Sequence, residues 1–123
     1  MSLASGRVLI VDDEPSIREL LRDFLTGEGY EALPVATGRD ALKAVPGFQP
    51  DVILIDMVMP GLSGADVLIA LRRIGVIVPV ILLSGYPLAV GEAFFGVLRK
   101  PFTLRMAGDL VAAALRHRRT LDA

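Results

Sequence analysis

The ten residues Asp51–Pro60, DVILIDMVMP, decide the fold of this 123-residue chain. Four consecutive aliphatic residues, Val52–Ile55, form a short run without polar interruption, which is typical of a strand buried on both faces of a parallel sheet. The run leads directly into the carboxylate of Asp56. Because a carboxylate at the end of a buried strand is costly unless a partner stabilises it, Asp56 is the first candidate for a functional residue.

The composition is that of one folded domain, which we place over residues 1–123 with a core at about 6–118. Hydrophobic residues make up 53% of the chain and the mean hydropathy is +0.57. Disorder is excluded on that composition, and no apolar run reaches the roughly 18 residues of a membrane span. Since the N-terminus also lacks the pattern of a signal peptide, we expect a cytoplasmic protein without membrane contact.

Charge and cysteine content narrow the function classes further. The 13 basic and 14 acidic side chains give a net charge of −1, which provides no general attraction to nucleic acid or anionic membranes. The chain has no cysteine, which rules out disulfides, thiol catalysis and cysteine-based metal sites.

Strand-length apolar runs alternate with segments of helical period along the chain. The expected strands are Arg7–Val11, Glu31–Ala36, Asp51–Asp56, Val78–Leu83 and Val97–Arg99. The expected helices are Pro15–Gly29, Gly38–Val45, Ala65–Ile74 and Thr103–Arg116, with N-caps at Asp13 or Glu14, Thr37 and Ser63. This alternation predicts an α/β domain with a doubly wound, five-stranded parallel sheet.

The connection from Gly85 to Arg99 fits this pattern least well. Its fifteen residues include three glycines and a proline, a composition that disfavours a helix. We therefore expect a shortened or irregular fourth helix of one or two turns around Leu88–Phe95.

Polar side chains follow four of the expected strands at the point where each strand ends. Asp12 and Asp13 follow the first strand, Asp56 ends the third, Ser84 follows the fourth and Lys100 follows the fifth. Ligands of open parallel sheets bind beyond the carboxyl ends of the strands. These five side chains are therefore expected to meet at one edge of the sheet.

The chemistry of this set points to phosphoryl transfer. Clustered carboxylates repel one another, and Mg²⁺, which prefers oxygen ligands, relieves that repulsion. A hydroxyl donor and a lysine next to the metal are what a transferred phosphoryl group requires. A carboxylate can be the nucleophile that accepts this group. Asp56 is the best candidate, because it stands alone whereas Asp12 and Asp13 form a pair.

Four motifs in this set carry a resemblance to a known family. They are VDDE at 11–14, DMVMPGLSG at 56–64, LLSG at 82–85 and RKPF at 99–102. Together, in this order and spacing, they resemble the receiver domain of bacterial two-component response regulators, in the CheY-like superfamily with its flavodoxin-like fold. The resemblance covers essentially the whole chain.

The resemblance implies a role for each residue of the set. Asp56 would be the phospho-acceptor, and Ser84 and Lys100 would contact the phosphoryl group. The ligands of Mg²⁺ or Mn²⁺ would be Asp12, Asp13, Asp56 and the backbone carbonyl of Val58. The Lys100–Pro101 peptide bond would be cis, as in the family.

The resemblance also implies a signalling switch in a phosphorelay, whose partners are a histidine kinase or a histidine phosphotransfer protein and an unidentified effector. The only histidine, His117, lies in the RHRR segment at 116–119 and ends no strand, so the donor is another molecule. We expect self-phosphorylation and autodephosphorylation but no enzyme activity on a separate substrate. The receiver would be stand-alone or part of a hybrid kinase.

The chain departs from the family pattern before Lys100. Receivers have about one more helical turn between the hydroxyl residue and the lysine, and an aromatic switch residue where this chain has Val97. Either Tyr86, Phe94 or Phe95 replaces the switch, or signalling bypasses it. We favour the bypass.

Two other functions stay open. A covalent aspartyl-phosphate hydrolase resembling the haloacid dehalogenase superfamily would need a second acid at position 58, where this chain has Val58. A docking module that is never phosphorylated would not need the acidic set. We interpret RHRR as solvated cations at a helix C-terminus, and a homodimer through the last helix stays open.

Overall fold

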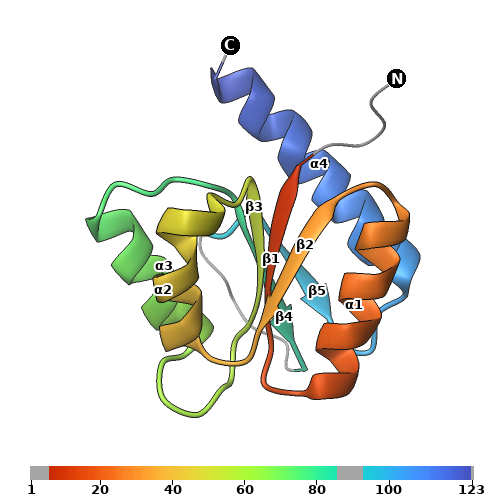
Figure 1. The fold of residues 1–123 in the computed structure, drawn as a ribbon, viewed down its shortest axis with the longest axis horizontal. Coiled ribbons are helices and arrows are strands. Elements are labelled where there is room, and N and C mark those ends of the chain that lie inside the picture. The colour runs from red at the N-terminus through yellow and green to blue at the C-terminus, as the bar shows by residue number, and fades with distance from the viewer. Residues whose placement is uncertain (1–5, 86–92, 123) are drawn as a thin grey trace.

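The computed structural model describes residues 6–85 and 93–122, with side chains up to residue 118. Five parallel strands form one sheet in the order β2-β1-β3-β4-β5 (Figure 1). The strands are β1 (Arg7–Val11), β2 (Glu31–Val35), β3 (Val52–Asp56), β4 (Val80–Ser84) and β5 (Gly96–Arg99). The predicted α/β fold is confirmed.

Helices cover both faces of this sheet (Figure 1). They are α1 (Pro15–Gly27), α2 (Gly38–Phe48), α3 (Gly64–Arg73) and α4 (Leu104–Asp122). Helices α2 and α3 lie on one face, and α1 and α4 lie on the other. The expected irregular helix at Leu88–Phe95 and the ring of Tyr86 fall largely on residues 86–92, which lie outside the described part, while Ala93–Phe95 form a turn.

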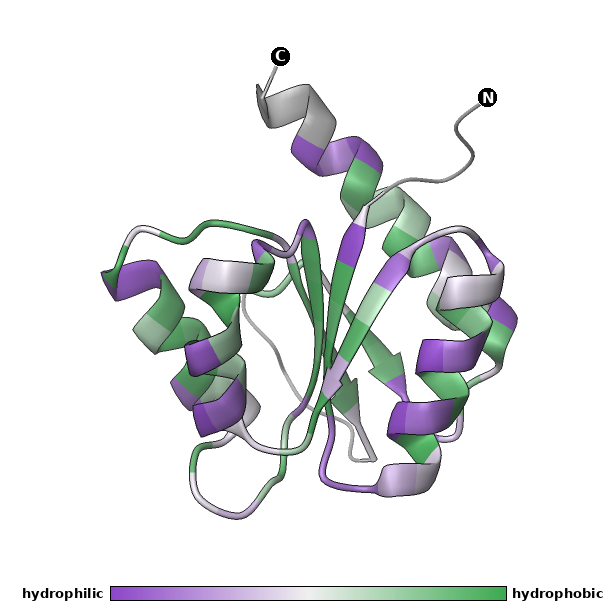
Figure 2. Ribbon diagram, in the orientation of Figure 1, coloured by the Kyte–Doolittle hydropathy of each residue, from purple (hydrophilic) through white to green (hydrophobic). Residues whose placement is uncertain are grey.

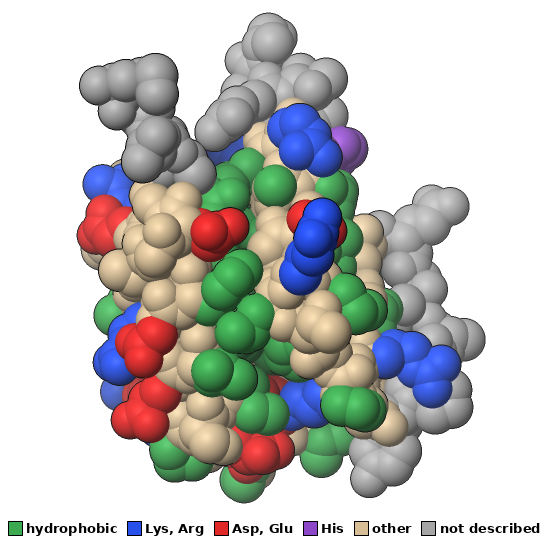
Figure 3. All heavy atoms as spheres, turned by 90° about the vertical axis from the view of Figure 1, so that its right-hand side faces the viewer, with side chains coloured by type: hydrophobic (Ala, Val, Ile, Leu, Met, Phe, Trp, Pro, Cys, Tyr) green, Lys and Arg blue, Asp and Glu red, His purple; other side chains and the backbone are tan. Residues whose placement is uncertain are grey.

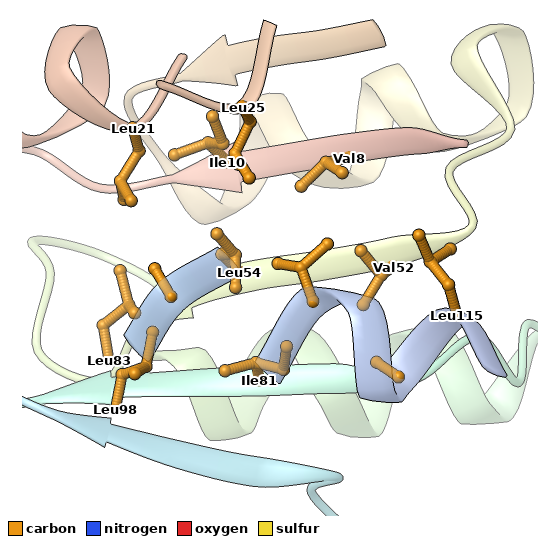
Figure 4. Packing of buried hydrophobic residues seen from close by; sticks show 13 residues of the cluster. Val8, Ile10, Leu21, Leu25, Val52, Leu54, Ile81, Leu83, Leu98 and Leu115 are labelled. Atoms are coloured by element: carbon orange, nitrogen blue, oxygen red, sulfur yellow. The ribbon is translucent and has the colours of Figure 1, made fainter. Parts of the chain in front are cut away.

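The central strands are apolar on both sides because both sides are covered. Alternate residues of β1, β3 and β4 pack toward α1 and α4, with Val8, Ile10, Val52 and Leu54 pointing into that layer (Figure 4). The intervening residues pack toward α2 and α3. Figure 2 shows that the strands are mostly hydrophobic, whereas the helices combine hydrophobic and hydrophilic residues. Each fully buried aliphatic side chain stabilises the fold by about 1.5–3 kcal/mol.

Strand register places the strand ends level with one another. Val11 pairs with Ile55, Asp56 with Leu83, and Ser84 with Arg99. The residues that follow these pairs, including Asp12 and Lys100, therefore meet at the carboxyl edge of the sheet.

The side-chain caps of the helices agree with the sequence in two cases out of three. The Thr37 hydroxyl accepts a hydrogen bond from the Asp40 amide at 3.0 Å, and Ser63 forms a capping box with Asp66. For α1, the N-cap falls on Glu14, one of the two predicted residues, but without a side-chain hydrogen bond.

Some element bounds differ from the predictions for identifiable reasons. β4 begins at Val80 and not at Val78, because Pro79 has no N–H to donate to the ladder. α2 extends to Phe48, with Pro46 inside its last turn. Among the described residues, no helix is both long enough and apolar enough to cross a membrane.

The last helix extends beyond Arg116, and its end contacts the body of the domain. Arg118 lies 3.9 Å from Asp51 and donates to the Pro50 carbonyl at 3.3 Å. The rings of His117 and Phe95 are 5.4 Å apart. The interpretation of this segment as solvated cations is therefore wrong for Arg118, whereas His117 is exposed as expected. Asp51 also accepts a hydrogen bond from the Arg7 amide at 2.8 Å.

Candidate functional site

Three aspartates meet at the carboxyl edge of the sheet. Carboxylate oxygens of Asp12, Asp13 and Asp56 lie within 4.8 Å of one another. Asp12 is fully buried and Asp56 is 7% exposed, whereas Asp13 is exposed. Two of the three carboxylates are thus buried, and the third, that of Asp13, faces solvent.

Both carboxylate oxygens of Asp12 have a hydrogen-bond donor. The Glu14 amide donates to one at 2.9 Å, and the ammonium of Lys100 donates to the other at 3.2 Å. The guanidinium of Arg18 donates to the Asp12 carbonyl at 2.9 Å. These contacts hold the loop between β1 and α1 in place and fix the Asp12 side chain.

Lys100 is the cation of the site. Its ammonium lies 3.2 Å from Asp12, 3.4 Å from Asp56 and 3.8 Å from Glu14. Burial lowers the pKa of Lys100, but the charges of Asp12 and Asp56 outweigh burial, and the net effect raises the pKa above its usual value. Lys100 is therefore held as a charged ammonium. Its peptide bond to Pro101 is cis, as predicted.

The environment of Asp56 disfavours its ionised form. Burial raises the pKa of this carboxyl, and the neighbouring charge of Asp12 raises it further, while Lys100 and the Val58 amide lower it only partly. The Val58 amide donates to Asp56 Oδ1 at 3.4 Å. An additional cation would therefore be bound favourably here.

The donor set fits a hard divalent cation. The converging ligand atoms are all carboxylate oxygens, which suit Mg²⁺ or Mn²⁺. The backbone of Val58 lies beside Asp56 through its amide, and its carbonyl as a metal ligand stays a prediction.

The family model described as the response regulator receiver domain matches residues 8–111. The chain belongs to this receiver family.

Curated relatives of this receiver are longer proteins. The DNA-binding response regulator MtrA of Mycolicibacterium smegmatis is 41% identical over 84 residues, which cover 68% of this chain and 36% of MtrA. The transcriptional regulatory protein TcrA of Mycobacterium tuberculosis is 39% identical over 105 residues, covering 80% of this chain and 41% of TcrA. The receiver thus spans about two fifths of the length of these relatives.

Solved structures support the same family. The response regulator TrrA of Thermotoga maritima, in complex with Mg²⁺ and BeF, is 34% identical with a TM-score of 0.80, covering 89% of this chain and 98% of that one. A receiver domain from Clostridium thermocellum is 30% identical with a TM-score of 0.86, covering 94% and 98%.

The structure of the receiver places every predicted site residue at this edge. Ser84 is the last residue of β4 and is 1% exposed, and its carbonyl accepts a hydrogen bond from the Lys100 amide at 2.7 Å. Asp12, Asp13, Asp56 and Lys100 are in mutual contact or close to it. Their roles in phosphoryl transfer stay predictions.

The sequence did not reveal three contributors to the site. Glu14 pairs with Lys100, and Arg18 holds the Asp12 carbonyl. At Gly64, the first residue of α3, a Cβ would lie 2.8 Å from the Asp56 carbonyl oxygen. Glu14 and Arg18 are one helical turn apart on the side of α1 nearest the acidic loop, and this spacing was the available signal. Nothing in the sequence indicated the close approach at Gly64.

Val97 occupies the position of the aromatic switch and packs with the cluster beneath α2 and α3. Phe94 packs with that cluster too, whereas Phe95 packs on the opposite side, toward α4. The two neighbouring rings thus lie in different layers. The bypass of the switch, which we favour from the sequence, stays a prediction.

Proposed function

We propose that this receiver accepts a phosphoryl group on Asp56 from a phosphohistidine of a histidine kinase or histidine phosphotransfer protein. The observation that carries the proposal is the position of Asp56. Its carboxylate is buried, lies 3.4 Å from the Lys100 ammonium, and shares a 4.8 Å cluster with Asp12 and Asp13. A nucleophile, a cation and further oxygen ligands are thus assembled at one point.

The transfer is a single displacement at phosphorus. A carboxylate oxygen of Asp56 attacks, an oxygen–phosphorus bond forms, and the phosphorus–nitrogen bond to the donor imidazole breaks. The electron pair of that bond returns to the imidazole nitrogen. The Val58 amide, which donates to Oδ1, keeps the carboxylate oriented toward the incoming group.

Other residues of the chain stabilise the phosphoryl oxygens. The ammonium of Lys100 is close enough to pair with them, and the Ser84 hydroxyl is placed at the end of the neighbouring strand. A metal held by Asp12, Asp13, Asp56 and the Val58 carbonyl would supply further charge neutralisation.

Phosphorylation would change the pairing of Lys100. The new dianion competes for an ammonium that Asp12, Asp56 and Glu14 now share. Because Lys100 directly follows β5, its movement would shift the loop that leads into α4. We propose that a partner recognises this shift.

The face formed by α1 and α4 is a suitable docking surface for the protein that donates the phosphoryl group. Figure 3 shows hydrophobic side chains gathered on it among charged ones. Leu20 on α1 is 54% exposed and Met106 on α4 is 49% exposed. α1 begins directly beyond the acidic loop, so a protein bound there would lie next to Asp56.

The names of the relatives suggest the output. MtrA is described as a DNA-binding response regulator, and we propose that this receiver likewise controls an effector that acts on DNA. We propose a cytoplasmic location for the same reason. We propose no enzyme activity on a separate substrate.

Intact mass measured after incubation with acetyl phosphate and Mg²⁺ tests the proposal. We expect a gain of one phosphoryl group, lost in Asp56→Asn and retained in the matched control Asp23→Asn, an exposed residue of α1. No gain with any phosphodonor would favour the docking module. Steady turnover of a phosphoester without a lasting adduct would favour the hydrolase.

A further inference from the structure

A cavity of about 470 Å³ lies at the edge of the sheet opposite the acidic cluster. The loop between α3 and β4, the turn that leads into β5 and the end of α4 form its walls. These segments lie at the amino ends of β4 and β5, the end of the sheet at which β1 begins (Figure 1). None of its lining residues belongs to the site described above.

The charged residues of this cavity are all basic. These are Arg72 and Arg118, which line the cavity beside the imidazole of His117, and its lining residues, which belong to the described part of the chain, include no Asp or Glu. Arg118 is partly neutralised by Asp51 at 3.9 Å. The cavity therefore carries an excess of positive charge.

Arg72 contributes most to this excess. Its guanidinium donates to the Val76 carbonyl at 2.9 Å, which satisfies one of its N–H groups. Within residues 6–85 and 93–118, no carboxylate forms an ion pair with it. Burial lowers the pKa of Arg72, which reflects the cost of removing the charge from water. An anion bound here would offset that cost.

The remaining walls are aromatic and aliphatic. Phe94 and Phe95 are half-buried and line the cavity, and the Phe95 ring lies 5.4 Å from that of His117. Ile77, which is 74% exposed, stands at the rim. Apolar walls with a few convergent polar groups are typical of small-molecule sites, as is this volume.

We propose that this cavity binds a small organic anion that carries a carboxylate or phosphate-like group on a flat apolar ring. The guanidinium groups of Arg72 and Arg118 would hold the oxyanion, because their planar geometry suits such groups. The ring would pack against Phe94 and Phe95. The inference concerns a site remote from Asp56 and does not depend on phosphorylation.

Phenylphosphonate is a suitable probe, because its phosphorus–carbon bond prevents phosphoryl transfer to Asp56. Titration of the full chain with chelator present, followed by amide NMR, should give saturable shifts at Val76–Val78, Phe95 and His117. Inorganic phosphate has no ring and benzyl alcohol has no charge. We expect each to bind about tenfold more weakly.

Two pairs of variants separate this site from a general effect of charge. Arg72→Gln should lower affinity about tenfold, whereas Arg73→Gln, an exposed neighbour that does not line the cavity, should not. Ile77→Asp should also weaken binding by adding a negative charge at the rim. Ile69→Asp makes the same change at an exposed position of α3 outside the cavity, and it should leave affinity unchanged.

Arg72→Gln could lower affinity simply by disturbing the loop at Val76. The comparison of Ile77→Asp with Ile69→Asp avoids this problem, because both residues are exposed and can be replaced without loss of folding. Shifts centred on Asp12, Asp13 and Asp56, or no saturation, would overturn the proposal. So would equal losses in both members of a pair, since binding would then follow net charge.

Discussion

The ammonium of Lys100 lies 3.4 Å from the carboxylate of Asp56. The same ammonium lies 3.2 Å from Asp12, so one cation serves two buried carboxylates and cannot neutralise both. The excess of negative charge favours the binding of a further cation. When no cation is bound, the same excess destabilises the folded protein.

Replacing Asp56 with asparagine should therefore stabilise the protein when a chelator is present. The raised pKa of Asp56 means that the fold disfavours its ionised form, and the amide removes that charge while keeping the shape. We expect a rise of a few degrees in the thermal unfolding midpoint at neutral pH. Asp23→Asn is the control, and a fall in the midpoint would contradict the charge argument.

The stability that Asp56→Asn gains over the wild type should decrease as pH falls. A raised folded-state pKa means that wild-type stability is highest when Asp56 is protonated and is lost as pH rises through that pKa. The advantage of Asp56→Asn should therefore shrink as pH falls toward the ordinary aspartate value of 3.8. Urea unfolding of both proteins across this range measures the difference, and an advantage that grows toward acid pH would refute the sign.

Removing Lys100 should be strongly destabilising. Lys100→Met leaves Asp12 and Asp56 together without their shared cation, and breaking a buried pair in this way costs about 3–5 kcal/mol. Mg²⁺ should restore part of the loss, because it can neutralise the same carboxylates. Chemical unfolding with and without Mg²⁺ measures both effects. Lys43→Met, at an exposed position of α2, should change little.

Substituting Gly64 should disturb the acceptor itself. A Cβ there would lie 2.8 Å from the Asp56 carbonyl oxygen, so Gly64→Ala must displace α3 or the end of β3. We expect a loss of about 1–3 kcal/mol in the free energy of unfolding and slower phosphorylation by acetyl phosphate. Gly47→Ala in α2 meets nothing within 4 Å. It should be neutral or stabilising, and equal effects of the two substitutions would rule out the steric explanation.

Asp13 should contribute to metal binding without supporting the fold. Asp13 is exposed and shares the carboxylate cluster, so Asp13→Asn removes one charged ligand and leaves the pairs of Lys100 in place. Calorimetric titration should show weaker Mg²⁺ binding, since affinity follows the number of charged ligands, with an unchanged unfolding midpoint in chelator. Unchanged affinity would remove Asp13 from the ligand set.

The sheet and the main residues of the site were predictable from sequence because the signals are local. Val52–Ile55 shows no alternation, and this identifies a strand covered on both faces. Once the strands are parallel, Asp12, Asp56 and Lys100 must lie at one edge, because each ends a strand or directly follows one. Ser63 and Thr37 precede their helices with typical capping residues, and both cap as predicted.

The failures arose where distant residues compete for the same groups. Asp12, and not Asp13 or Glu14, accepts the amide at the start of α1, since its side chain is fixed there by Lys100. Arg118 pairs with Asp51 across 67 positions of sequence, and no local pattern predicts such a contact. The role of Gly64 depends on the distance between α3 and β3, which is a property of the packed domain.

The contacts of Asp51 also bear on where the independently folding unit ends. One carboxylate joins the amide of Arg7 at the start of the first strand to Arg118 in the last helix. Core residues Ala114 and Leu115 likewise lie beyond residue 111, the last position matched by the family model. A fragment that ended at residue 111 would lose both these core residues and the contact between Asp51 and Arg118. We therefore expect an independently folding receiver to need α4 at least as far as Leu115, about one helical turn past the region matched by the family model.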